Sequence, residues 1–269
     1  MLGVCCGGND GLLTVGCEGF GCNVSCMNVT SDHMRRALAF AGEVVAETLW
    51  PTRCALCNRP GQVLCARCER ELAYMDWWRC CPRCGSAYGR VQCCDCNPVS
   101  LAHLGAGEFP FSGCTSAVMF DADTGSLVRI YKDQGEERLA AVFASMMARA
   151  LPPAWDFDAI TFVPATLGAF RTRGFDHAEL LATQLASCVG KPCLPLLARP
   201  VARDQRSLGR RKRLANVTGR FKAGAHVPRD INLLLVDDVC TTGATLSDAT
   251  RALLAAGAAT VYCATFARA

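Results

Sequence analysis

The spacing of apolar residues along the chain changes near residue 98. Beyond that point, short apolar runs alternate with amphipathic stretches. The runs predict strands at 116–120, 157–163, 233–236 and 260–266, and the stretches predict helices at 139–151 and from the turn after 242 to Gly257. Strands that alternate with helices predict an α/β domain with a mainly parallel sheet covered on both faces.

Before residue 98 the dominant feature is cysteine, because 15 of the 20 cysteines of the chain lie in residues 1–96. The N-terminus lacks a basic segment followed by an apolar core and a cleavage site, so we expect a reducing, cytoplasmic compartment. There, metal thiolates are more plausible than disulfides. No apolar run reaches 18 residues, so we expect no membrane span.

Four Cys-x-x-Cys pairs recur at one spacing, which is typical of zinc ligands. Eight thiolates predict two structural zinc ions, most simply Cys54, Cys57, Cys65 and Cys68 for one and Cys81, Cys84, Cys93 and Cys96 for the other. An interleaved pairing is an alternative, and Cys80 and Cys94 make the register less secure at two pairs. Trp77 and Trp78 are interpreted as a modest core or as a platform for stacking bases.

Residues 1–33 hold five further cysteines without ligand spacing. One interpretation is a further metal-binding tail. The interpretation we favour is that the protein starts at Met34 and that residues 1–33 are an upstream extension, which we expect to have no packed structure. Residues 34–53 then predict a short amphipathic helix that Pro51 ends.

The stretch 233–246 carries the clearest chemistry. Four apolar residues lead into Asp237 and Asp238, and a loop rich in Thr and Gly opens the next helix. Free N–H groups at a helix start favour a phosphate, while two carboxylates suit the hydroxyls of a sugar. The sequence therefore predicts a buried strand, a polar loop beginning at the acids, and a sugar-phosphate pocket there.

This stretch resembles the phosphoribosyl-pyrophosphate (PRPP) loop of type I phosphoribosyltransferases. With the paired cysteines and the segment Arg171-Thr172-Arg173-Gly174-Phe175, the chain resembles the ComF family over roughly residues 36–268. The resemblance implies a double zinc ribbon at 54–98, followed at 99–269 by a domain of the type I phosphoribosyltransferase kind. It also implies a link to DNA uptake in competent bacteria, with PRPP and Mg²⁺ as ligands.

Carried over by motif, the acids Asp237 and Asp238 contact the ribose hydroxyls. The 5′-phosphate is bound by the loop of Thr241, Thr242, Gly243, Ala244 and Thr245. The turn Val163, Pro164 and Ala165 is the candidate for pyrophosphate, with Lys132, Arg171 and Arg173 as candidate cationic partners. Asp176 and His177 stand where the family usually has Asn and Gln, and Ala202 replaces a usual Thr; His177 is interpreted as structural or superficial rather than as a proton donor.

The segment 199–222 holds nine Lys or Arg against one acid. Such an excess favours contact with a nucleic-acid backbone, a flap that closes over PRPP, or a plain solvated loop. The nucleic-acid candidates are Arg203, Arg206, Arg210, Arg211, Lys212 and Arg213.

Two functions remain open at this point. In the first, the chain transfers a phosphoribosyl group to an acceptor that the sequence does not identify. In the second, it handles single-stranded DNA without turnover, and its PRPP pocket is regulatory or vestigial. Oligomeric state and protein partners have no sequence signal.

Overall fold

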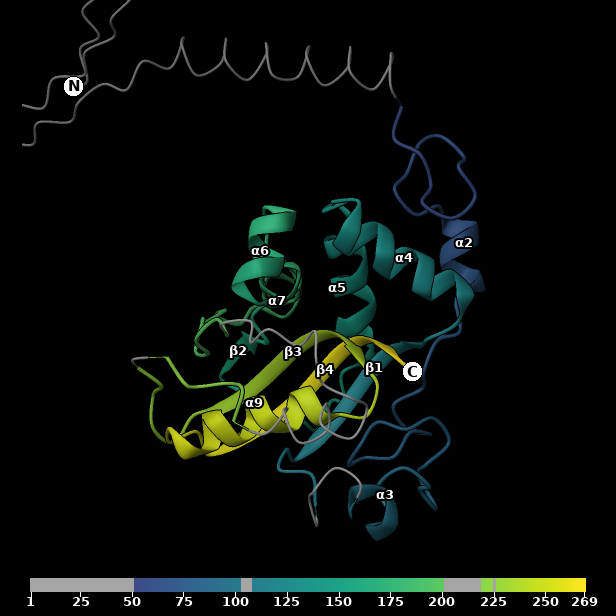
Figure 1. Cartoon of the computed structure of the whole chain (residues 1–269). Coiled ribbons are helices and arrows are strands. Elements are labelled where there is room, and N and C mark those ends of the chain that lie inside the picture. Colours follow the sequence, from purple (N-terminus) through teal and green to yellow (C-terminus); the bar gives the residue numbers. More distant parts are fainter. Residues whose placement is uncertain (1–50, 103–107, 201–218, 225) are drawn as a thin grey trace, which may run out of the picture. The chain divides into compact units, whose positions relative to one another are not determined.

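The computed structural model describes residues 51–102, 108–200, 219–224 and 226–269 (Figure 1). The part from Arg53 to Ala269 forms one compact unit. The predicted extension 1–33 and nearly all of the predicted helix 34–53 lie outside the described residues.

The core of the unit is a parallel sheet, as the sequence predicts. Its four strands within the described residues are β1 (Gly113–Met119), β2 (Ala159–Phe162), β3 (Asn232–Cys240) and β4 (Thr260–Arg268), in the order β1-β4-β3-β2. One row across the sheet pairs Gly113 with Tyr262, Tyr262 with Leu234, and Leu234 with Ile160. All four strands therefore end at the same edge.

Helices cover both faces of this sheet (Figure 1). Helices α5 (Leu139–Ala150) and α7 (His177–Val189) pack together over one face, and α9 (Ala244–Ala255) covers the other. Along β3 the side chains alternate between the two apolar clusters: Leu234 joins the cluster of α5 and α7, while Leu233 and Leu235 join that of α9. Burial on both faces explains why this strand reads as a continuous apolar run.

Two shorter connections carry site residues. Helix α4 (Ala122–Asp133) follows β1, and α6 (Leu167–Arg173) follows β2. The candidate cations Arg171 and Arg173 both lie in the last turn of α6. Gly174, with a φ of 82°, ends α6, and α7 starts at His177. Two helices form here because Thr166 and Asp176 each cap a helix N-terminus with a side-chain oxygen.

The cysteine-rich part contains the short helices α2 (Ala66–Glu71) and α3 (Pro98–Ala102). The segment between its two halves lies along the outer edge of β1, where the N–H of Met75 donates to Ala117 O at 2.9 Å and the N–H of Met119 donates to Ala73 O at 2.8 Å. On the opposite edge, Leu194 pairs with Ile160 of β2. Other segments of the chain thus cover both edges of the sheet. An uncovered edge strand could pair with a strand of another molecule. Among the described residues, no helix is long and apolar enough to cross a membrane.

Candidate functional site

The acidic pair lies inside β3 rather than in a loop. The strand continues through Asp237 and Asp238 to Cys240, which corrects the expected strand end at Val236. Asp237 pairs with Thr265 of β4, and both carboxylates are buried, with 9% and 3% exposure. The acids are therefore held on a rigid strand near the edge where all four strands end.

Two residues distant in sequence converge on Asp238. The ammonium of Lys132, in the last turn of α4, makes an ion pair with Asp238 Oδ2. The His177 Nε2 lies 3.8 Å from Asp238 Oδ1, and its Nδ1 lies 3.4 Å from a guanidinium nitrogen of Arg173. His177 is buried, so it is not a surface residue, and it belongs to the immediate surroundings of the acids.

These contacts shift the pKa values of the two carboxyl groups in opposite directions. Burial and the neighbouring Asp238 raise the pKa of Asp237 well above its usual value. Burial alone would also raise the pKa of Asp238, but Lys132 and His177 outweigh it, so that pKa is lowered. Lys132 and His177 thus favour the ionised form of Asp238 over that of Asp237.

The Thr- and Gly-rich loop follows β3 directly. Thr241 and Thr242 are exposed, and Gly243 forms the N-cap of α9 in the left-handed region, with a φ of 75°. The hydroxyl of Thr242 accepts from the N–H of Ala244 at 3.4 Å. The first-turn N–H groups of a 12-residue helix point towards this loop, and Thr245 lies in that first turn. All five predicted phosphate residues are therefore gathered at one helix start.

An open pocket of about 430 Å³ lies between the end of α4 and α6. Its lining includes Lys132, Arg173 and Phe175. Arg173 also approaches Asp133 at 3.3 Å. Arg171 is exposed and does not line the pocket, whereas Arg173 lines it and contacts His177.

The backbone N–H groups of the predicted pyrophosphate turn already have acceptors within the protein. The N–H of Val163 donates to Val236 O at 2.9 Å, Pro164 has no N–H, and the N–H of Ala165 donates to Asp176 Oδ2 at 2.9 Å. The backbone of these three residues is thus already engaged. Cationic side chains are the better candidates for holding pyrophosphate in this geometry.

Asp176, which sequence reasoning treated only as a departure from the family, organises this corner. Its side chain is fully buried and accepts from the N–H groups of Ala165, Ala178 and Glu179 and from the Arg199 guanidinium at 2.8 Å. The guanidinium of Arg199 also lies over the ring of Phe170, 4.2 Å from its centroid. Only the position of Asp176 just before a helix hinted at this role, as an N-cap.

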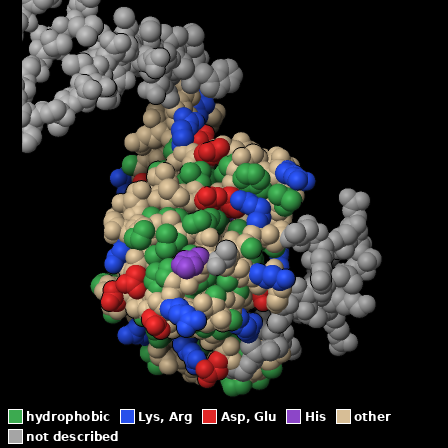
Figure 2. Space-filling model, turned by 90° about the vertical axis from the view of Figure 1, so that its left-hand side faces the viewer, with side chains coloured by type: hydrophobic (Ala, Val, Ile, Leu, Met, Phe, Trp, Pro, Cys, Tyr) green, Lys and Arg blue, Asp and Glu red, His purple; other side chains and the backbone are tan. Residues whose placement is uncertain are grey.

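The nucleic-acid candidates between 203 and 213 all lie outside the described residues. Both ends of the segment that contains them are anchored near the site. Arg199 holds one end, and at the other Asp248 of α9 accepts from the N–H groups of Gly219, Arg220 and Phe221. On the face shown in Figure 2, Lys and Arg side chains alternate with Asp and Glu, so the described part of that face has no field of a single sign.

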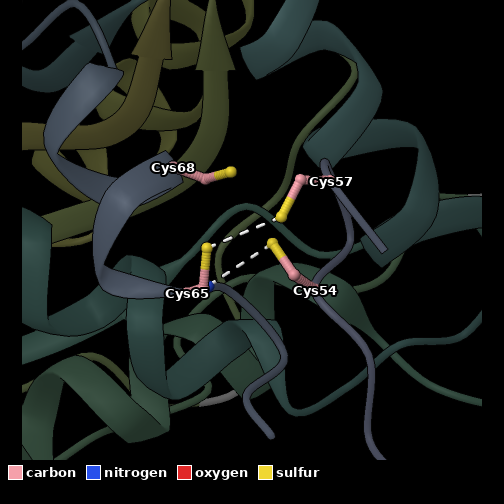
Figure 3. A group of neighbouring side chains, drawn as sticks. All are labelled: Cys54, Cys57, Cys65 and Cys68. Atoms are coloured by element: carbon pink, nitrogen blue, oxygen red, sulfur yellow. Dashed lines mark hydrogen bonds between the residues drawn. The ribbon is translucent and has the colours of Figure 1, made fainter. Parts of the chain in front are cut away.

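The eight predicted ligands form two separate groups, which excludes the interleaved pairing. The first Cys₄ group is Cys54, Cys57, Cys65 and Cys68, whose thiols point towards one another in Figure 3, and the second Cys₄ group is Cys81, Cys84, Cys93 and Cys96. Sulfur pairs lie 3.7, 3.6 and 3.4 Å apart. Four thiolates around a zinc ion at about 2.3 Å stand about 3.8 Å from each other, so both groups fit a structural zinc.

Comparison with known proteins agrees with this geometry. Residues 137–269 match the phosphoribosyl transferase domain family. The competence protein ComFC of Streptococcus pneumoniae is 26% identical over 218 residues, which cover 81% of this chain and 93% of that protein. A match of that length extends well into the cysteine-rich part.

The chain is similar to ComF-type proteins over most of its length. The DNA utilization protein YhgH of Salmonella typhimurium is 28% identical over 214 residues, covering 74% of this chain and 93% of that protein. Among solved structures, the glutamine PRPP amidotransferase of B. subtilis is 21% identical and aligns with a TM-score of 0.35, over 48% of this chain and 26% of that chain.

Proposed function

We propose that this ComF-type protein binds PRPP and transfers its phosphoribosyl group to a nitrogenous acceptor. The observation that carries the proposal is the sequence of groups at the end of β3, where two buried carboxylates are followed by a Thr- and Gly-rich helix start. A ligand with vicinal hydroxyls and a 5′-phosphate matches both halves.

In this proposal Asp237 and Asp238 accept hydrogen bonds from the ribose hydroxyls, and the start of α9 holds the phosphate. In the transfer, the bond from the anomeric carbon to pyrophosphate breaks, and pyrophosphate leaves with the electron pair. The acceptor nitrogen forms the new bond and loses a proton. Lys132 and Arg173 stabilise the charge that develops on pyrophosphate.

Two carboxylates are a donor set that suits Mg²⁺, which proteins commonly hold with one or two carboxylates and substrate oxygens. Asp237 and Asp238 would hold it here. When bound, the ion neutralises charge on the departing pyrophosphate.

Calorimetry of PRPP with Mg²⁺ tests this site. The variant carrying both Asp237→Asn and Asp238→Asn should bind at least about tenfold more weakly, because losing about 1.4 kcal/mol of interaction is tenfold in affinity. Asp158→Asn is the matched control, because Asp158 accepts from the N–H of Asn232 at the other end of β3. Equal affinity of wild type and double variant would rule out the site. Pyrophosphate release with a panel of bases and amines then tests turnover.

A second function, contact with single-stranded DNA imported into the cytoplasm, is favoured by the surface beside the second Cys₄ group. There Trp78 is 55% exposed and Tyr88 68% exposed, and the Arg79 guanidinium lies 5.0 Å from the centroid of the Tyr88 ring. The N–H of Arg90 donates to Arg79 O, which places two arginines side by side. Exposed rings next to cations suit stacking on unpaired bases. Trp78 is thus not the core residue that one interpretation of the sequence expected.

Fluorescence anisotropy with a labelled oligonucleotide tests this second function. Trp78→Ala with Tyr88→Ala should weaken binding by about tenfold or more, since stacking contributes about 1–3 kcal/mol per base. Tyr74→Ala is the control, because Tyr74 is also exposed and lies near an arginine, Arg149. If the control weakens binding as much as the double variant, the surface is not the one that binds DNA.

A further inference from the structure

Arg268, near the end of β4, is a charged residue with only 9% exposure. Its guanidinium donates to the carbonyl of Cys84 at 3.1 Å, to the carboxylate of Asp95 at 3.1 Å and to the sulfur of Cys240 at 2.9 Å. A buried guanidinium is tolerated only with such partners. Two of the three belong to the second Cys₄ group and its loop, and the third is the residue before Thr241.

At the phosphate loop, Arg268 contacts a single residue, Cys240. Cys240 is the last residue of β3 and directly precedes the turn of Thr241, Thr242 and Gly243 that leads into α9. The position of Cys240 therefore sets where this three-residue turn begins. A shift of Arg268 would move the sulfur of the residue from which the turn starts.

A second path connects the same two places. The ring of Phe109 lies against Gly243, where an added Cβ would come 3.2 Å from it. Phe109 is in the apolar cluster that also contains Cys81 and Cys84. The second Cys₄ group thus supports the loop through a polar contact and an apolar one.

The first Cys₄ group provides a contrast. Among the described contacts, it packs in the cluster of α5 and α7, and its nearby ion pair, Arg149 with Glu69 at 3.0 Å, is exposed. In the described part of the chain, no hydrogen bond or ion pair joins this group to residues 240–245. Any effect of metal on the loop should therefore be specific to the second group.

We propose that Arg268 is a positioning residue through which the second Cys₄ group sets the shape of the phosphate loop, so that PRPP binding and metal retention at that group are coupled. The proposal rests on the proposed PRPP binding. Because coupling between two binding sites is reciprocal, a metal that orders the loop raises PRPP affinity, and bound PRPP in turn slows metal loss.

The test uses the full chain loaded with zinc and a chromogenic chelator, with and without PRPP and Mg²⁺, alongside calorimetry of PRPP. In the wild type, PRPP should slow one of two phases of zinc release by about fivefold or more, the lower range of typical couplings. In Arg268→Lys, PRPP affinity should fall severalfold and the slowing should disappear. Arg149→Lys, the matched control, should behave as the wild type does.

Asp95→Asn provides a variant that should fold even if Arg268→Lys does not, because the Asp95 side chain is 50% exposed. It should reduce the slowing while leaving the loop residues intact. If the wild type binds PRPP and both phases of zinc release stay unchanged, the coupling is refuted and the proposed function stands. If the wild type does not bind PRPP at all, the proposed function fails, and the coupling fails with it.

Discussion

Replacing Asp176 by Ala tests how the corner between β2 and α7 is held. The side chain of Asp176 caps α7, and it also binds the N–H of Ala165 and the guanidinium of Arg199. Asp121 is a natural comparison, because it caps α4 through the N–H of Thr124 and is exposed. The difference between the two variants isolates the tertiary contacts of Asp176.

The expected magnitude follows from these contacts. Loss of an N-cap costs about 1 kcal/mol. A buried N–H left without an acceptor, here that of Ala165, adds about 1–3 kcal/mol. The ion pair with Arg199 adds only about 1 kcal/mol, because the arginine side chain is 26% exposed and partly screened by solvent. Asp176→Ala should therefore lower the free energy of unfolding by about 3–5 kcal/mol, and Asp121→Ala by about 1 kcal/mol.

Urea unfolding of zinc-loaded protein measures both values, and thermal melting gives a second estimate. At about 2–4 °C per kcal/mol for a domain of this size, Asp176→Ala should lower Tm by roughly 6–20 °C and Asp121→Ala by about 2–4 °C. Equal losses in the two variants would mean that the contacts of Asp176 with Ala165 and Arg199 contribute nothing to stability, and the account of this corner would be wrong.

Three further predictions concern the site and the metal. Gly243→Ala should cost about 1–2 kcal/mol, because its φ of 75° disfavours a side chain, and should weaken PRPP binding by about tenfold; unchanged affinity would show that the turn does not hold phosphate. Lys132→Met should lower stability at neutral pH. The lowered pKa of Asp238 means that its ion pair stabilises the fold above about pH 4 and loses that effect as pH falls further, so the gap between variant and wild type should close in acid. A gap independent of pH would contradict that pairing. Zinc removal should speed amide hydrogen exchange where residues 73–75 pair with β1, and unchanged protection there would argue against metal-dependent folding of this part.

Much of the chain was predictable because its signals are local. The apolar run at 233–236 predicted a buried strand, since a strand covered on both faces needs apolar residues at successive positions. The Cys-x-x-Cys spacing predicted ligands, because two thiolates at that spacing reach one ion. The strand ends were less certain: β1 spans Gly113–Met119 where 116–120 was expected, and β2 spans Ala159–Phe162 where 157–163 was expected.

The sequence by itself thus determined the parallel α/β domain, the eight cysteines that form the two groups and the run of acids and threonines at the end of β3. Only the tertiary structure decided that the cysteines divide into consecutive groups and that the acids belong to β3. It alone brought Lys132 and His177 to Asp238, Arg199 to Asp176, and Arg268 to Cys240. The reason is physical: periodicity and ligand spacing act between near neighbours in the chain, whereas these pairs meet only through strand register and helix packing, which no short stretch of sequence encodes.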